Sequence, residues 1–192
     1  MIVITAGQRE GSTSIGRSFL RKSYLIFKHM QIERLLPSHW PEVFRIYEDG
    51  IASGNATFQT SAPDWEQWDN GHISDARLVA TLEGKVIGWA AISLVSNRSV
   101  YSGVGEVSVY VDPVVQGKGV GKLLLRELIV QSEKNGFWTL QAGIFPENIA
   151  SLKIHQDLGF RILCTREKIG KMNDTWRDTV LLERRSTVTG IN

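Results

Sequence analysis

Cysteine is nearly absent from this sequence of 192 residues, in which Cys164 is the single one. One thiol cannot form a disulfide within the chain, and together with four scattered histidines it makes no cluster at metal-ligand spacing. No apolar run approaches the length of a transmembrane helix. These absences argue against a disulfide-stabilised secreted domain, a metal site and a membrane span, and they favour a cytoplasmic protein.

A large excess of charge is also missing, since 22 Lys and Arg face 20 Asp and Glu. The positive excess comes from residues 1–29, which hold five Lys or Arg and one acid. The remainder is close to neutral and gives no reason to expect nucleic-acid binding. Because residues 1–29 run from a Gly/Ser-rich stretch into a basic aromatic one, we expect a flexible leader or an extension foreign to the native protein. The domain should span residues 30–186, followed by a tail, residues 187–192.

The body of the chain alternates between strand-like and helix-like patterns. Glycines at 136 and 159 follow two of the helical segments, where a C-terminal cap belongs. The order β-α-α-β-β-β-α-β-α-β-β predicts an α/β domain around one mixed sheet. We expect strands at 31–35, 77–83, 85–95, 105–112, 138–145, 160–168 and 175–184, and helices at 37–51, 63–74, 119–135 and 147–158.

The most informative segment is the glycine-rich run at residues 116–122, Gln-Gly-Lys-Gly-Val-Gly-Lys. It follows an alternating apolar strand and opens an amphipathic helix, so its main-chain N–H groups and the helix dipole could hold a phosphate group. It is not the nucleotide-binding pattern that ends in Lys-Ser or Lys-Thr, because Leu123 follows Lys122. On the string alone, a tight turn from strand to helix is an equally good interpretation.

The rest of the chain gives this loop a context. Its Gln-x-x-Gly-x-Gly pattern resembles the pyrophosphate loop of the GNAT family of acyl-CoA-dependent N-acetyltransferases, and the element order is similar to that family over residues 31–185. Further motifs resemble its phosphinothricin N-acetyltransferase branch, which includes methionine sulfone and methionine sulfoximine acetyltransferases. They are Gly-Glu-Val-Ser-Val-Tyr-Val-Asp at 105–112, Asn148-x-x-Ser151-x-x-x-His155, Gly159-Phe160 and Trp176-x-Asp178.

The resemblance implies a mostly antiparallel sheet that splays between its fourth and fifth strands, with helices on its faces and acetyl-CoA as co-substrate. The pantetheine arm would pair with the main chain of the strand in the gap, and the pyrophosphate would lie on the glycine-rich loop. The implied cofactor-binding residues are Val109, Tyr110, Val111, Gly117, Lys118, Gly119, Val120, Gly121, Lys122, Asn148 and Ser151. Simpler interpretations remain open, because the valines could be sheet core, the lysines solvated, and Asn148 or Ser151 a helix cap.

Two residues are candidates for the chemistry. An amine must lose a proton before it attacks a thioester, and Glu106 at the start of the cofactor strand matches the base of the branch. The alternative is an exposed strand carboxylate paired with a neighbour. His155 stands where many GNAT enzymes have tyrosine, and it could protonate the departing thiolate, assist the base or fill space.

An amino-acid acceptor also needs its carboxylate held, which arginine does well through paired hydrogen bonds. Arg98 and Tyr101 precede the central strand at positions that resemble the substrate loop of the branch. Thr57 and Phe58 resemble its N-terminal substrate loop, and Trp176 could form a wall of the pocket. A solvated surface arginine is the competing interpretation of Arg98.

The leading hypothesis is therefore an enzyme that moves acetyl from acetyl-CoA to the α-amine of a small amino-acid-like acceptor by direct attack in a ternary complex. Two alternatives stay open. One is acetylation of a peptide or protein N-terminus, and the other is a CoA-binding sensor without turnover. Relatives in the branch that the sequence resembles are commonly homodimers, and a monomer is also compatible with an edge strand, so the oligomeric state stays open. No metal is expected.

Overall fold

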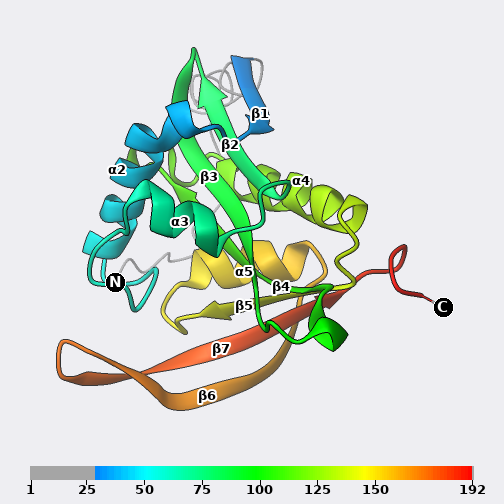
Figure 1. Ribbon diagram of the computed structural model, residues 1–192. Helices are drawn as coiled ribbons and strands as arrows, with labels where there is room; N and C mark the ends of the chain where they lie inside the picture. The colour runs from blue at the N-terminus through cyan, green and yellow to red at the C-terminus, as the bar shows by residue number, and fades with distance from the viewer. Residues whose placement is uncertain (1–28, 192) are drawn as a thin grey trace, which may run out of the picture.

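Seven strands form a single sheet in the part of the chain that the computed structural model describes, residues 29–191 (Figure 1). They are β1 (Met30–Arg34), β2 (Arg77–Leu82), β3 (Lys85–Leu94), β4 (Val104–Val111), β5 (Thr139–Ile144), β6 (Arg161–Met172) and β7 (Thr175–Arg185). Across the sheet their order is β1-β2-β3-β4-β5-β7-β6, and every neighbouring pair is antiparallel except β4 and β5. The predicted mixed, mostly antiparallel sheet is confirmed.

Four α-helices connect the strands within the described residues, in the predicted order. They are α2 (Trp40–Ala52), α3 (Trp65–Gly71), α4 (Val120–Lys134) and α5 (Ile149–Asp157). Three short 3-10 turns lie in the connections: η1 (Pro37–His39) before α2, η2 (Ser99–Tyr101) between β3 and β4, and η3 (Pro113–Val115) between β4 and α4. As Figure 1 shows, α2 and α3 lie on one side of the sheet, and the β6–β7 hairpin projects beyond its lower end. Most predicted boundaries agree to within a few residues.

The end of β6 is the largest difference between prediction and structure. We expected this strand to stop at residue 168, but it continues to Met172. A register shift between Arg166 and Gly170 interrupts the pairing with β7, and Lys168 takes a positive φ of 49° there. A bulge of this kind breaks the alternation of side chains from which strand ends are predicted.

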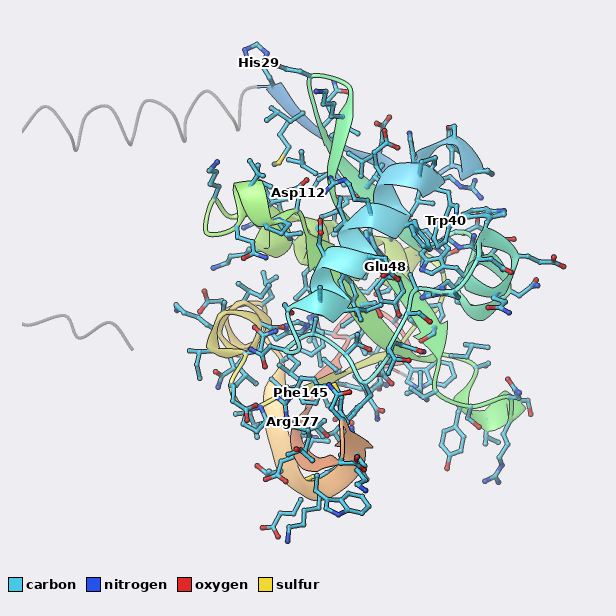
Figure 2. The ribbon with its side chains drawn as sticks, turned by 90° about the vertical axis from the view of Figure 1, so that its left-hand side faces the viewer. His29, Trp40, Glu48, Asp112, Phe145 and Arg177 are labelled. Carbon is cyan, nitrogen blue, oxygen red and sulfur yellow. The ribbon has the colours of Figure 1, made fainter. Side chains whose placement is uncertain are left out.

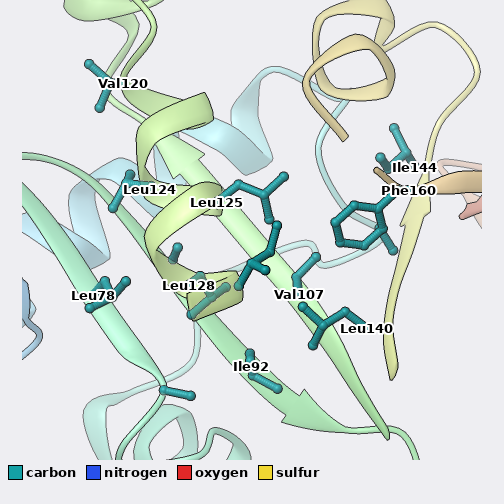
Figure 3. Close-up of a cluster of buried hydrophobic side chains, with 14 of the residues drawn as sticks. Leu78, Ile92, Val107, Val120, Leu124, Leu125, Leu128, Leu140, Ile144 and Phe160 are labelled. Carbon is teal, nitrogen blue, oxygen red and sulfur yellow. The ribbon is translucent and has the colours of Figure 1, made fainter. Parts of the chain in front are cut away.

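Both faces of the sheet are covered by apolar side chains. On one face, Leu124, Leu125 and Leu128 of α4 are fully buried and pack among strand residues (Figure 3). On the other face, Val43 and Ile46 of α2 belong to a second cluster, which also contains one tryptophan each from α3 and β3. Spacing of three to four residues brings these helical side chains onto one stripe, as the sequence pattern predicts.

The sheet parts between β4 and β5, and this parting positions the site. Their parallel pairing covers three residue pairs, the last of which joins Glu106 to Gln141. Beyond Glu106, β4 continues to Val111 beside β3 alone, while β5 continues to Ile144 beside β7. One edge of β4 therefore keeps its main-chain groups unshared after Glu106, which confirms the predicted splay.

Of the two predicted domain boundaries, only the one near residue 186 lies well inside the described residues. Apart from His29, the proposed leader of residues 1–29 lies outside the described residues. At the other end, the Ser186 and Thr189 hydroxyls donate to the side-chain and main-chain oxygens of Glu133, at 2.9 and 3.1 Å. The tail thus runs along the end of α4. Within the described residues, no helix has the length and apolarity that crossing a membrane requires.

Candidate active site

A cleft of about 580 Å³ opens where β4 and β5 part. Its walls come from both strands, from residues 56–59 after α2, from α5 and from the β6–β7 hairpin. Eight of the predicted site residues line it together: Thr57, Phe58, Glu106, Val109, Tyr110, Asn148, Ser151 and His155. The structure thus brings the predicted base, part of the predicted cofactor strand and the predicted N-terminal substrate loop to one place.

Glu106 stands at the fork itself. It is the last β4 residue paired with β5, and on its other side it pairs with Ser93 of β3. Its neighbours Gly105 and Val107 are buried, whereas Glu106 is exposed and lines the cleft. Because side chains alternate along a strand, the Glu106 carboxylate points away from the core and toward the gap between β4 and β5.

His155 forms part of the floor of the cleft and is only 3% exposed. Its Nδ1 lies 2.8 Å from the carbonyl oxygen of Ser151, and because a carbonyl can only accept, Nδ1 carries the proton. Burial lowers the pKa of His155, so the ring favours its neutral form with Nε2 unprotonated. This state suits a group that accepts a proton better than one that must donate it to a departing thiolate.

Tyr110 connects the cleft to the aromatic cluster on the opposite face of the sheet. Its ring stacks on Trp89 with centroids 4.6 Å apart and lies 4.8 Å from the ring of Tyr47. The pKa of Tyr110 is raised well above its usual range, mainly because the phenol is buried and to a smaller extent because Tyr47 lies next to it. The phenol therefore keeps its proton at neutral pH. A side chain on Gly50 would collide with this ring, at 2.6 Å, so the glycine makes room for it.

The glycine loop, residues 116–121, presents main-chain N–H groups close to the end of β4, beside the gap between β4 and β5. Gly117 and Gly119 take positive φ values of 73° and 82°, which only glycine adopts without strain. No side chain caps the start of helix α4. The first hydrogen bond of the helix runs from the N–H of Leu123 to the carbonyl oxygen of Gly119. Within the described residues, the N–H groups from Gly119 to Lys122 have no hydrogen-bond acceptor, so they are free for an anion.

The two lysines of this segment are engaged elsewhere. Lys118 Nζ donates to the carbonyl oxygen of Val114 at 2.9 Å, and Lys122 Nζ pairs with Asp157 of α5 at 2.7 Å. These contacts suit lysines that hold local structure, so what the loop offers to an anion is its main-chain N–H groups. Gly121 lies close to neighbouring elements, because a Cβ there would be 3.3 Å from Val111 and 3.5 Å from Ile154.

Asn148 has two protein partners. Its Oδ1 accepts from the N–H of Ser151 at 3.1 Å, which caps α5, and its Nδ2 donates to the carbonyl oxygen of Asn55 at 3.1 Å. The capping interpretation of Asn148 thus holds in this structure, and its predicted contact with pantetheine stays a prediction. The second bond ties residues 53–62, the loop that follows α2, to the start of α5.

Arg177 of β7 ties the same loop from the other side. Its guanidinium lies over the Phe145 ring at 4.0 Å (Figure 2), and Nη1 donates to the carbonyl oxygen of Gly54 at 3.0 Å. The second nitrogen pairs with Glu147 at 3.1 Å. Phe58 packs edge-on against the same Phe145 ring, at 4.9 Å. The loop that carries Thr57 and Phe58 is therefore held over the cleft by residues distant in sequence.

Three predicted substrate residues do not line the cleft. Arg98 and Tyr101 belong to the exposed η2 region, where the guanidinium of Arg98 lies 5.5 Å above the Tyr101 ring. Trp176 pairs with Lys171 near the tip of the β6–β7 hairpin, and it is 56% exposed. Their roles in substrate binding stay predictions, and in this structure other residues face the cleft.

The residues that sequence reasoning missed are Arg166, Arg177, Gly143 and Thr179. Arg166, Gly143 and Thr179 line the cleft, and Arg177 holds its loop. None of them belongs to a recognisable motif, and a single arginine in a strand carries no signal without the fold. No group of three or more His, Cys, Asp or Glu side chains that could hold a metal ion occurs among residues 29–191.

The sheet that parts between β4 and β5, together with the uncapped start of α4, is the arrangement that the sequence resemblance implies for an α/β acyltransferase, and comparisons with known proteins name the family. Residues 38–160 match the family described as "Acetyltransferase (GNAT) family". The chain therefore belongs to the GNAT family of acetyltransferases, which confirms the resemblance seen in its sequence.

Individual relatives agree with this membership. The chain is 33% identical over 150 residues to the phosphinothricin N-acetyltransferase of Alcaligenes faecalis, covering 75% of this chain and 76% of that protein. It is 29% identical over 149 residues to the L-methionine sulfoximine/L-methionine sulfone acetyltransferase of Pseudomonas paraeruginosa, covering 74% and 87%. The structure resembles a phosphinothricin acetyltransferase of Sinorhizobium meliloti crystallised with AcCoA, with a TM-score of 0.76, 27% identity and coverage of 85% and 92%.

Proposed function

We propose that this protein transfers the acetyl group of acetyl-CoA to the α-amine of a small amino-acid-like acceptor, by direct attack in a ternary complex. The observation that carries the proposal is the free edge of β4 beyond Glu106, which borders the cleft. A ligand with amide groups can pair with such an edge as an added strand, and the pantetheine arm carries two amides.

The chain offers a matching site for the other end of acetyl-CoA. Among residues 29–191, the N–H groups from Gly119 to Lys122 have no hydrogen-bond acceptor, and they stand at the positive end of the α4 dipole, as a diphosphate requires. A cradle built from main-chain groups suits this ligand without help from the two engaged lysines. Acetyl-CoA supplies the acetyl group as an activated thioester, and the fork would present that end beside Glu106.

Glu106 is proposed to accept the proton of the incoming ammonium group, directly or through water, because it is the exposed carboxylate at the fork. The neutral amine then forms the new C–N bond while the C–S bond breaks and the thiolate takes up a proton. Main-chain N–H groups of β4 beyond Glu106 would stabilise the carbonyl oxygen as it gains charge. His155, neutral and buried, is proposed to assist as a proton acceptor.

The way the cleft is enclosed supports a small acceptor. Phe58 and Phe145 pack against each other on one wall, and three contacts hold the loop of residues 53–62: those from Arg177 and Asn148, and one from the Ala62 N–H to Glu48. A tethered loop encloses a small molecule better than it admits a peptide. The names of the relatives above point the same way, because they act on phosphinothricin and on methionine sulfone or sulfoximine.

An acceptor panel tests the proposal. Purified full-length protein is mixed with acetyl-CoA and with phosphinothricin, methionine sulfone, methionine sulfoximine, plain amino acids or short peptides, and release of CoA thiol is followed. We expect turnover with one or more of the small amino acids. Turnover with peptides alone would favour N-terminal acetylation. Binding of acetyl-CoA without thiol release from any acceptor would favour a sensor.

A further inference from the structure

Arg166 places a guanidinium in the cleft that the proposed chemistry does not use. It lies on β6, is half-buried, and is the one Lys or Arg among the described residues that line the cleft. Its Nε donates to the hydroxyl of Thr179 on β7 at 3.1 Å, which fixes the direction of the side chain. Across residues 29–191, no carboxylate forms a salt bridge with its two terminal nitrogens.

Gly143 of β5 marks where this guanidinium points. A Cβ added to Gly143 would lie 3.0 Å from Nη2 of Arg166 and 3.8 Å from Oε1 of Glu106. The cationic group and the proposed base therefore border the same small space above Gly143. They make no ion pair with each other in the described structure, although their charges are opposite. The missing side chain at residue 143 keeps this space open.

We propose that Arg166 binds the carboxylate of the acceptor and so makes the enzyme specific for α-amino acids. The inference rests on the proposed acetyl transfer, because it uses Glu106 as the group that meets the amine. An α-amino acid carries its ammonium and carboxylate groups on one carbon. A carboxylate and a guanidinium on either side of a narrow gap are the complement of that pair. Arginine is suited to this task because its planar fork binds both carboxylate oxygens.

The bulge in β6 explains how an edge strand supplies this group. Arg166 is the last residue that pairs with β7 before the register shift, and Thr179 is its partner across the ladder. The bulge bends the strand just beyond Arg166, and the Lys168 N–H donates to Asp178 at 2.7 Å to hold that bend. Arg98, the arginine that the sequence suggested for this role, instead lies over Tyr101 outside the cleft.

Kinetics with matched acceptors test the assignment. Methionine sulfone is compared with its amide and with 3-(methylsulfonyl)propylamine, which lack the carboxylate, in the native protein and in Arg166→Gln. We expect Arg166→Gln to lower kcat/KM for methionine sulfone by about 10- to 100-fold, mainly through KM, which is the range for losing a charged hydrogen-bond partner. Turnover of the two carboxylate-free amines should be unchanged, and Arg166→Lys should recover part of the loss.

Two further variants sharpen the result. Gly143→Ala keeps the arginine but puts a methyl group into the gap, so it should also raise KM for methionine sulfone more than for the propylamine. Arg161→Gln is the control, because Arg161 lies on the same strand and pairs with Glu183 at the surface. It should leave the ratio between the acceptors unchanged. Melting temperatures confirm that each variant is folded.

The outcomes separate this inference from the proposed function. If Arg166→Gln is folded and still prefers methionine sulfone over its amide as the native protein does, the assignment is wrong. If Arg98→Gln removes the preference instead, the carboxylate site lies at η2 and the assignment is equally wrong. If the native protein acetylates no amine, the proposed function fails. Calorimetric titration of methionine sulfone in the presence of CoA then still decides whether binding depends on Arg166.

Discussion

The two sides that we propose for the cofactor and for the acceptor are built in opposite ways. Apart from Asn148 and Ser151, the cofactor side is one continuous stretch, residues 106–122, and it offers mainly main-chain groups: a free strand edge and the uncapped start of α4. The acceptor side is assembled from segments that the fold brings together, such as the Arg177 side chain and the main-chain carbonyl of Gly54, which are 123 residues apart in sequence. A main-chain site depends on glycines and on fold, whereas a side-chain site can change its ligand by single substitutions.

The largest effect on turnover is expected at Glu106, where the two sides meet. We expect Glu106→Gln to lower kcat by about 10²- to 10⁴-fold, the usual contribution of a positioned base, with little change in the Kd of acetyl-CoA. Stopped-time thiol assays and calorimetry measure the two quantities. Glu42→Gln, on the exposed side of α2, is the control. Unchanged turnover in folded Glu106→Gln would remove this residue as the base.

The cofactor side can be tested alone with two matched glycines. Gly117 and Gly136 have φ values of 73° and 81°, and an added Cβ has open space at both. Alanine at either position should cost about 1–2 kcal/mol of unfolding free energy, because the left-handed conformation strains it. Only Gly117→Ala should also weaken acetyl-CoA binding, by about tenfold, since it disturbs a loop bound through main-chain groups.

Equal acetyl-CoA affinity in the two glycine variants would contradict a phosphate site in the glycine loop. Chemical denaturation gives the loss of stability and calorimetry gives the affinity. Because the strain is matched, a difference in affinity cannot come from a general loss of stability.

On the acceptor side, Arg177 is the tether to remove. Arg177→Met keeps apolar contact with Phe145 but loses the bond to the Gly54 carbonyl. We expect KM for the acceptor to rise by several-fold, roughly the loss of one hydrogen bond, while the Kd of acetyl-CoA stays the same. Glu147→Gln is the control, since it removes only the exposed ion pair of Arg177. A rise in the Kd of acetyl-CoA would show that the two sides are not separate.

The last test concerns pH, which acts on stability and is expected to affect the two sides least. Burial lowers the pKa of His155, so the unfolded chain binds its proton more readily than the folded protein does. The stabilising contribution is complete above the usual histidine pKa of about 6.5 and is lost as pH falls toward the lowered value. Unfolding free energy should therefore decrease from pH 7 to pH 5, by at most about 1.4 kcal/mol per pH unit for one proton.

His155→Asn should flatten this slope, and urea denaturation at several pH values measures it. Some slope should remain, because burial lowers the pKa of His72 in the same direction. A variant with the slope of the native protein would show that His155 takes up its proton without cost to the fold.

Sequence reasoning succeeded where structure is local. The strand at 105–112, the glycine loop and the helix after it form one continuous segment, so their pattern, together with the element order and the family resemblance, was enough to predict the fold and to single out Glu106. It was less informative about the carboxylate of the acceptor, for which Arg98 looked suitable from its position before the central strand, whereas the structure places Arg98 over Tyr101 and outside the lining of the cleft. Arg166 could not be found in the same way, because its direction depends on a bulge and on a partner across the hairpin. Neither the bulge nor the partner across the hairpin can be predicted from the spacing of residues along the chain.

The stack of Tyr110 on Trp89 has a practical consequence. Trp89 is 1% exposed and lies beneath a ring that borders the cleft, so a ligand that moves this ring changes the surroundings of a buried indole. Tryptophan emission should then report occupancy without any label. Replacing Trp89 with phenylalanine would silence that optical signal and leave the other five tryptophans as background.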